Sequence, residues 1–308
     1  MILGATMMVA LLFSLAVKTK GQSKTTWRSL DLRCEHLIAP LGIDEPNPRL
    51  MWRSLRENQE GKQQAYRIVV GLDSMEVSKD NGKIWDSGEV PSDDILVRYN
   101  GVPLEPLSRY YWKVIVWNGG DQPMNSQVTA FETGMMGTSS WKGTWISDQH
   151  DIHYKPAPYF RKEFLTDKPI KRARAYIAAA GLFELSLNGK KVGDHFLDPM
   201  YTRFDRRTLY VVHDVTSLLQ DGANAIGVVL GNGWYNHQAL AVWDFHRAPW
   251  RQRPAFCMDL RIEYQDGTTQ TIVSERDWKT SSGPIIANNI YTGEHYDARL
   301  EQPGWDKV

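Results

Sequence analysis

The feature that most constrains the fold is a series of short alternating runs that are separated by turn-forming residues. In the clearest run, residues 110–117, every second side chain is apolar and would share one face of a strand: Tyr110, Trp112, Val114 and Val116. The Asn-Gly-Gly sequence that follows at 118–120 predicts a turn. Long stretches with the 3.6-residue period of a helix are missing from the sequence. It therefore predicts an all-β protein that is built from β-sandwiches.

Length and charge restrict the class of protein further. With 308 residues the chain is long enough for two domains with their own cores. Lys plus Arg and Asp plus Glu both number 36, so the formal net charge is zero. That balance argues against nucleic acid or an anionic membrane surface as the main partner. The 12 Trp and 13 Tyr allow two interpretations, namely rings that pack in sandwich cores and rings that stack on sugars.

The N-terminus has the pattern of an export signal. An apolar run at 7–17 is too short to span a bilayer comfortably and is followed by the polar residues 18–23. We therefore predict a signal peptide over residues 1–23, export to the periplasm or the outside of the cell, and no membrane span. Because no Lys or Arg precedes the run, an apolar helix of the folded domain is the alternative. Cys34 and Cys257 fall in different predicted domains, so no disulfide framework is expected.

The first predicted domain covers residues 29–134. Its strands include residues 65–70 and 110–117, and Leu104-Glu105-Pro106 before Tyr110 has the spacing of a tyrosine corner. Over its whole length, and with its motifs in the same order, this segment resembles the fibronectin type III modules that precede many bacterial glycosidases. The resemblance implies a spacer or brace. It is carried by the motifs at 47–52, 65–68, 85–88, 111–114 and 131–134.

The second predicted domain covers residues 141–308 and follows an aperiodic connector at 135–140. Asn188-Gly189 predicts a tight hairpin turn, because both central residues need positive φ. Asp266-Gly267 predicts another hairpin, between strands at 255–264 and 269–273. The number of strands fits a jelly-roll sandwich.

This second domain resembles the N-terminal jelly-roll domain of bacterial α-L-rhamnosidases. The matching motifs lie at 180–185, 188–194, 214–216, 230–235 and 293–299. The resemblance implies recognition of a rhamnose-containing glycan, and related domains bind L-rhamnose through calcium. With the module before it, the resemblance covers nearly the whole chain after the predicted signal peptide.

Candidate ligand residues follow the strand that ends at Leu230. Two glycines flank an amide there and two aromatic rings follow, which suits a pyranose. The predicted carbohydrate-binding residues are Asn232, Trp234, Tyr235, Trp243, Asp244 and Trp250. The alternative is that these rings close over the core of their own domain. Oxygen-bearing side chains nearby are the candidate calcium ligands, with solvated loop residues as the alternative: Asp194, Asp198, Asn232 and Asp244.

We predict no catalytic residue in this chain. Glu294 and Asp297 are only three positions apart, which does not ensure the spacing that glycoside hydrolysis requires, and Asp297 with Arg299 predicts a structural ion pair. Members of the family hydrolyse terminal α-L-rhamnosides with a helical (α/α) barrel, and the sequence contains no such barrel. We therefore expect a fragment, a truncated reading frame or a barrel on a partner chain. The chain alone would be inactive, either as a glycan-recognising accessory half or, alternatively, as a structural brace that binds no sugar.

Overall fold

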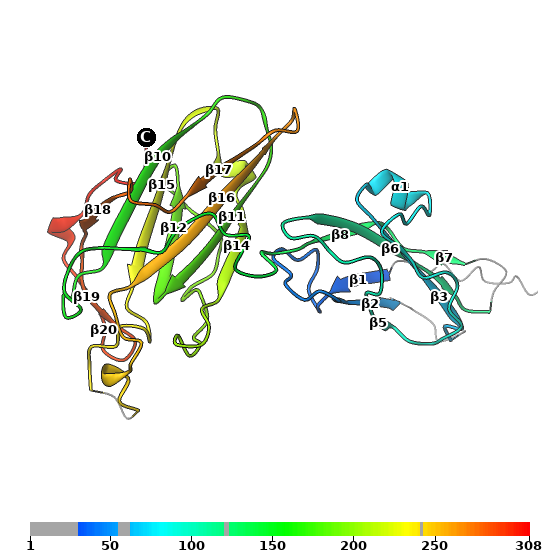
Figure 1. Ribbon diagram of the computed structural model, residues 1–308, viewed down its shortest axis with the longest axis horizontal. Helices are drawn as coiled ribbons and strands as arrows, with labels where there is room; N and C mark the ends of the chain where they lie inside the picture. Colours follow the sequence, from blue (N-terminus) through cyan, green and yellow to red (C-terminus); the bar gives the residue numbers. More distant parts are fainter. Residues whose placement is uncertain (1–29, 55–61, 120–122, 241–242) are drawn as a thin grey trace, which may run out of the picture.

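The computed structural model describes residues 30–54, 62–119, 123–240 and 243–308, so the predicted signal peptide at 1–23 lies outside the described residues. In this described part, no helix is long and apolar enough to cross a membrane. Two β-sandwiches lie beside each other along the long axis of the molecule and meet at a narrow junction (Figure 1).

The first sandwich consists of two antiparallel sheets around one apolar core. Three strands form one sheet, in the order β1 (Leu30–Cys34), β2 (Arg49–Ser54) and β5 (Leu96–Arg98). The other sheet contains β4 (Trp85–Asp86), β3 (Ala65–Gly71), β6 (Arg109–Trp117), β7 (Met124–Asn125) and β8 (Thr129–Glu132). The predicted apolar face of β6 points into this core, where Trp112 and Val114 are fully buried.

The tyrosine corner is confirmed. The backbone N–H of Glu105 donates a 2.8 Å hydrogen bond to the hydroxyl of Tyr110, whose ring stacks on Phe131. The single-turn helix α1 (Ser74–Ser78) was not predicted from the sequence. Its cap is the side chain of Asp73, which accepts hydrogen bonds from Met75 N and Glu76 N.

The second sandwich also has two antiparallel sheets. One runs β13 (Lys190–Lys191), β12 (Leu182–Leu187), β15 (Gly222–Gly231), β10 (Pro158–Thr166) and β18 (Lys279–Ser282). The other runs β14 (Tyr210–Asp214), β11 (Ile170–Ala180), β16 (Ala255–Tyr264) and β17 (Thr269–Val273), with β9 (Ile146–Ser147) beside β16. A separate hairpin of β19 (Ile285–Asn289) and β20 (Gly293–Tyr296), together with three short 3₁₀ helices, completes the domain: η1 (Thr216–Leu218), η2 (Phe245–Arg247) and η3 (Ala298–Leu300).

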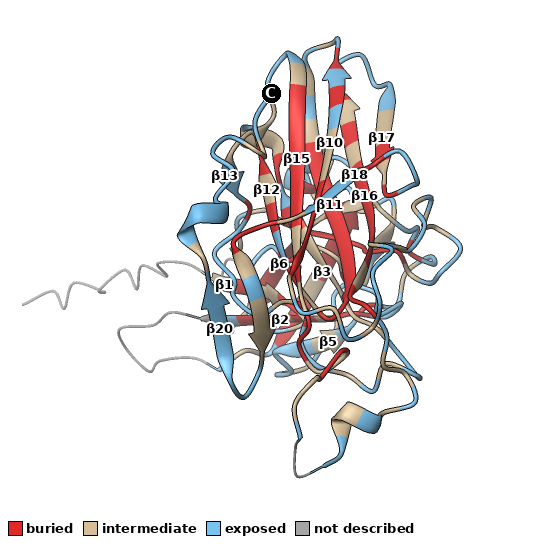
Figure 2. Ribbon diagram, turned by 90° about the vertical axis from the view of Figure 1, so that its left-hand side faces the viewer, coloured by how far each residue is buried: buried red, intermediate tan, exposed pale blue. Residues whose placement is uncertain are grey.

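The connectivity of the second sandwich is that of a jelly roll. Strands β10, β11, β12, β14, β15 and β16 alternate between the two sheets, so the chain crosses the core at almost every connection. Buried residues of β10, β11, β12, β15 and β16 form one apolar core, and these strands carry long buried stretches in Figure 2. Both predicted hairpins are confirmed: Asn188 and Gly189 have φ of 51° and 75° between β12 and β13, and Gly267 has φ of 84° between β16 and β17.

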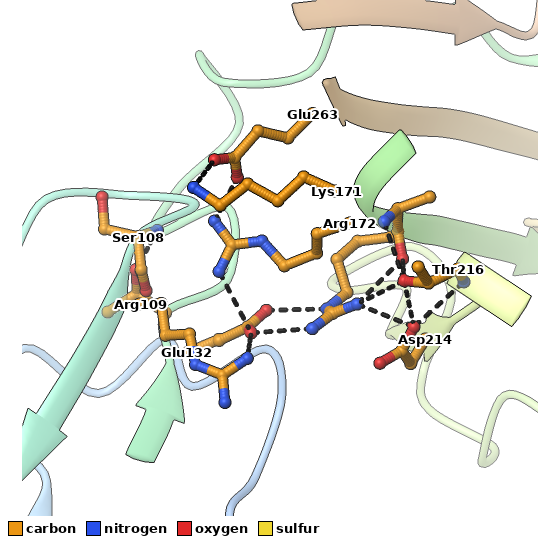
Figure 3. A network of polar contacts seen from close by, with 11 residues as sticks. Ser108, Arg109, Glu132, Lys171, Arg172, Asp214, Thr216 and Glu263 are labelled. Carbon is orange, nitrogen blue, oxygen red and sulfur yellow. Dashed lines mark hydrogen bonds and ion pairs between the residues drawn. The ribbon is translucent and has the colours of Figure 1, made fainter. Parts of the chain in front are cut away.

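A buried ion pair joins the two sandwiches. Glu132 at the end of β8 accepts two hydrogen bonds from Arg174 on β11, at 2.8 and 2.9 Å. Both side chains are buried, with 8% and 7% of their surface exposed. The other side of the Arg174 guanidinium contacts the Asp214 carboxylate at 2.8 Å (Figure 3). Because each charge has several partners, the desolvation cost of burying them is offset.

A second contact between the sandwiches depends on glycine. The Tyr210 hydroxyl donates to Asp44 at 2.8 Å and accepts from the backbone N–H of Met135 at 2.9 Å. A Cβ atom at Gly134 would overlap this hydroxyl, and one at Gly42 would come within 2.6 Å of Val212 Cγ2. The chain segments at this junction therefore approach β14 closely only because two positions lack side chains.

Acid is expected to weaken this junction through Asp214. Burial alone would raise the pKa of Asp214, but hydrogen bonds from Thr216 and the charge of Arg174 outweigh it and hold the pKa below its usual value. Stability from this group is therefore present above the unfolded pKa of about 4 and is lost as the pH falls through the lower folded value. We expect Asp214→Asn to flatten the decline in melting temperature between about pH 5 and pH 2. Asp221→Asn, which removes an exposed carboxylate, is the control and should leave this decline as it is in the wild type. Equal acid profiles for wild type and Asp214→Asn would contradict this assignment.

Candidate functional site

A groove of about 530 Å³ lies on the outer face of the second sandwich, where the sheet meets the β19–β20 hairpin. Its floor comes from strands β10, β12 and β15, and the hairpin forms one wall. The residues that contribute polar atoms or apolar surface to a bound molecule are Tyr159, Glu184, Leu197, Val229, Asn289, Ile290 and Glu294. A groove of this size accommodates a small ligand.

Two carboxylates flank the tyrosine of this groove. The pKa of Tyr159 is raised to about 12, first by burial and then by Tyr296, Glu294 and Glu184. Glu184 lies on β12 with 65% of its side chain exposed, and its one ion pair within the described residues is a long contact, 3.5 Å, to Lys191. Carboxylates with free lone pairs are hydrogen-bond acceptors for hydroxyl groups, and two of them disfavour an anionic ligand.

The predicted turn after β15 forms part of the groove. Its glycines Gly231 and Gly233 line the groove, whereas Asn232 is 1% exposed. The Asn232 backbone N–H donates to Asn288 Oδ1 at 2.7 Å, and its Nδ2 donates to the Asn288 carbonyl at 3.0 Å. Asn232 therefore ties β15 to the β19–β20 hairpin and shapes the groove from below.

The rings after this turn form a cluster at the same end of the domain. Trp234 contacts Phe245, Tyr291 and His237, with ring centroids 4.9, 5.4 and 5.7 Å apart. Tyr235 packs on Phe204 at 5.1 Å, and Trp250 lies 6.2 Å from Phe245. Trp234, Tyr235 and Trp250 are half-buried. Much of their surface therefore packs against neighbouring rings.

Trp243 and Asp244 differ from these residues because they are exposed. Trp243 has 69% of its surface accessible, and its ring meets that of Phe245 edge-on at a centroid distance of 6.2 Å. Asp244 has a left-handed backbone with φ of 53° and immediately precedes η2. Of the six predicted sugar-binding residues, these two present free surface to a ligand outside the groove.

Unsatisfied polar atoms gather at this end of the domain. Among the residues that the structure describes, Asn232 Oδ1 and Asn289 Nδ2 are buried without a hydrogen-bond partner. Burial lowers the pKa of His237, and the charges of His246 and Arg251 act in the same direction. Buried polar atoms in native proteins usually have a protein, water or ligand partner. Asn289 lines the groove, but its Nδ2 atom is buried and its Oδ1 atom already accepts from the backbone N–H groups of Tyr291 and Thr292.

The four candidate calcium ligands are not gathered into one cluster. Asp194 and Asp198 flank His195, with Asp198 Oδ2 2.9 Å from His195 Nδ1, while Asp244 lies 4.0 Å from His246. In the described ranges, no three His, Cys, Asp or Glu side chains are grouped closely enough to hold a metal ion. Ca²⁺ takes six to eight oxygen ligands, so these side chains alone do not form its site. Calcium binding stays a prediction.

The predicted ion pair at the C-terminal side of the groove is confirmed. Asp297 accepts from Arg299 Nε at 2.8 Å and from Arg299 Nη2 at 2.6 Å. Glu294 instead lines the groove. The two cysteines, Cys34 and Cys257, are buried free thiols, and burial raises their pKa to about 12 and about 11 respectively.

Sequence reasoning missed several residues of this site. Glu184 alternates with buried neighbours on β12, which marks it as outward-facing, but nothing local shows which element covers that face. Asn289 and Glu294 belong to a hairpin whose position over the sheet follows only from the tertiary fold. Arg251 was also missed; it fixes the long loop by donating to Asn236 Oδ1 at 2.9 Å and to the His246 carbonyl at 3.0 Å.

The fold and the groove define the class of protein: an immunoglobulin-like sandwich followed by a jelly roll with a ligand-sized groove. Family models agree with this division. Residues 30–137 match the Rha78A-like N-terminal immunoglobulin domain, and residues 168–308 match the α-L-rhamnosidase N-terminal domain. The immunoglobulin description refines the fibronectin type III-like prediction, and both names denote sandwiches of related architecture.

Known relatives give the same result. An α-L-rhamnosidase of Formosa agariphila is 33% identical over 301 residues, covering 86% of this chain and 31% of that protein. One from Alteromonas sp. is 31% identical over 285 residues, covering 88% of this chain and 30% of that protein. The solved structure of the α-L-rhamnosidase from Dictyoglumus thermophilum superposes with a TM-score of 0.81 at 39% identity, covering 90% of this chain and 32% of that one.

The chain belongs to the α-L-rhamnosidase family and corresponds to the N-terminal part of its members. It spans about a third of the length of these relatives.

Proposed function

We propose that this chain is the glycan-recognising part of an exported α-L-rhamnosidase, and that its groove binds a rhamnose unit. The observation that carries the proposal is the combination of Glu184 and Glu294 with apolar side chains around one groove. The two carboxylates offer hydrogen-bond acceptors to sugar hydroxyls. A catalytic domain of the longer relatives would supply hydrolysis of terminal α-L-rhamnosides.

The apolar part of the groove suits a 6-deoxy sugar. Leu197, Val229 and Ile290 line it and offer a surface on which the methyl group of L-rhamnose can be buried. A hydroxymethyl group at the same position would place a polar group against these side chains. The carboxylates favour a neutral sugar over a uronate or a sulfated one because like charges repel.

Calorimetric titration of L-rhamnose into the protein tests the proposal. We expect saturable heat with one site. Glu294→Gln should weaken binding roughly tenfold, because a hydrogen bond to a charged acceptor contributes about 1.5–3 kcal/mol. L-Mannose, which differs from L-rhamnose only by the added 6-hydroxyl, should bind at least several-fold more weakly. Glu89→Gln, which changes an exposed carboxylate of the first sandwich, is the matched control and should bind as the wild type does.

Two further experiments locate the sugar-binding site and test the predicted calcium dependence. Trp243→Ala weakens binding only if the sugar stacks on the aromatic cluster instead of entering the groove. Titration in calcium and again in EDTA shows whether the predicted calcium dependence exists. Absence of saturable heat in both buffers would contradict sugar binding by this chain.

A structural brace is the second candidate function. It is favoured by the junction, where the buried pair of Glu132 and Arg174 and the contact of Tyr210 with Asp44 hold the two sandwiches together. The junction is compatible with both candidate functions, a brace and a sugar-binding unit. Titration with L-rhamnose therefore distinguishes them.

A further inference from the structure

A small polar cavity of about 50 Å³ lies between the two sandwiches, away from the groove. The first sandwich contributes Leu107, Arg109 and Glu132, and the second contributes residues of β11, β16 and β17. The side chains that define its character are Arg109, Glu132, Arg172, Arg174, Tyr176, Arg261, Glu263 and Thr269. The volume is roughly three to five times what one ordered water needs.

The lining of this cavity carries an excess of positive charge. Four guanidinium groups face two carboxylates, Glu132 and Glu263. Two further charges lie just outside the lining: Lys171 pairs with Glu263 at 2.7 Å and Asp214 pairs with Arg174 at 2.8 Å. They cancel each other, so an excess of two positive charges remains in this half-buried space.

Both carboxylates are already shared among several cations (Figure 3). Glu132 is bound by Arg174 at 2.8 Å, by Arg109 at 3.2 Å and more loosely by Arg172 at 3.7 Å. Glu263 is bound by Lys171 at 2.7 Å and by Arg172 at 2.5 Å. No lining carboxylate is therefore left to neutralise Arg261.

The Arg261 side chain makes no hydrogen bond or ion pair with any other residue of the described ranges, although its backbone belongs to the sheet. It stands directly opposite Arg174 in the register of β11 and β16, and like charges in that position destabilise a sheet. Arg109 Nε is also buried and lacks a partner among the described residues. These donors come from both sandwiches and converge on one cavity, where nothing in the described chain accepts their hydrogen bonds.

We propose that this cavity binds one small oxyanion, of the size and charge of inorganic phosphate or sulfate, between the two sandwiches. Arg261 and Arg109 would each donate to an anion oxygen, and the hydroxyls of Thr269 and Tyr176 lie in the same lining. Guanidinium groups bind such oxygens with charge-assisted hydrogen bonds. The anion would neutralise the repulsion between Arg174 and Arg261 and link the first sandwich to the second.

Titration of the full chain with inorganic phosphate tests the site, with sulfate as a second probe and sodium chloride at equal ionic strength as the reference. We expect one saturable site, and a higher melting temperature in phosphate than in chloride. Arg261→Gln should weaken phosphate binding at least tenfold and remove the thermal shift. Arg261→Lys keeps the charge and should bind more tightly than Arg261→Gln. Arg206→Gln removes an exposed arginine outside the cavity and should bind phosphate within about twofold of the wild type.

One further result separates this site from general attraction of anions. In chloride at low ionic strength, Arg261→Gln should melt at or above the wild-type temperature, because it relieves the repulsion with Arg174. Equal melting curves in phosphate and chloride together with no saturable heat would overturn the proposal. So would an equal loss of binding in Arg206→Gln and Arg261→Gln.

Discussion

Replacing Arg174 by methionine is expected to lower the free energy of unfolding by about 3 kcal/mol, measured by urea denaturation. Removing one partner of a buried ion pair leaves an uncompensated charge, which typically costs 3–5 kcal/mol. We expect the lower end of that range because Glu132 keeps its 3.2 Å contact with Arg109. Asp214 would also lose its 2.8 Å contact.

Two comparisons make this prediction specific to burial. Arg203 also binds its carboxylate, Asp205, through two hydrogen bonds, at 2.9 and 3.0 Å, but 60% of its side chain is exposed. Arg203→Met should therefore cost less than about 1 kcal/mol. The double variant with Glu132→Met and Arg174→Met should recover part of the loss, because an apolar pair carries no desolvation cost. Equal losses in Arg174→Met and Arg203→Met would show that burial of the pair is unimportant.

Replacing Phe256 by alanine is expected to cost about 3–5 kcal/mol, the usual range for a buried aromatic side chain. Phe256 is fully buried on β16, and its ring lies 5.2 Å from the rings of both Phe160 and Trp278. The cavity left by its removal would lie between the two sheets of the jelly roll, where neighbouring strands restrict collapse. The melting temperature and the urea midpoint of the variant measure the loss.

Trp243→Ala is the matched control for this core substitution, since it deletes a larger ring that is 69% exposed. Its effect on the free energy of unfolding should stay within about 0.5 kcal/mol. The same variant serves in the sugar titration, so a stable Trp243→Ala protein also makes the binding result interpretable. A destabilisation comparable with that of Phe256→Ala would mean that Trp243 is packed in the folded protein.

The fold class follows from local sequence features that are clear in this chain. The alternating residues 110–117 form β6, and their apolar side chains face the core because an extended strand places every second side chain on one face. Asn188-Gly189 forms its hairpin because positive φ is needed at both positions and these residues tolerate it. These features act over a few residues, so a single sequence is enough to interpret them.

The candidate site was predictable only in part. The turn at Asn232 does lie at the ligand-sized groove, but its side chain is buried and bonded to Asn288. The exposed polar groups of the groove come from Glu184 on β12 and Glu294 on β20, which are 110 positions apart in the sequence. No local pattern indicates that a hairpin near residue 290 covers the outer face of β12, because that placement depends on packing between distant elements.

By itself the sequence determined the strands, the tight turns, the order of the two sandwiches and the family, because each depends on side-chain periodicity, on backbone conformation or on motifs with fixed spacing. Only the tertiary structure decided which charges are buried. Glu132, Arg174 and Arg261 look like ordinary strand residues in the sequence, yet the junction of the sandwiches places all three around one cavity. Burial changes the strength of an electrostatic interaction far more than residue identity does, and burial is a property of the assembled fold.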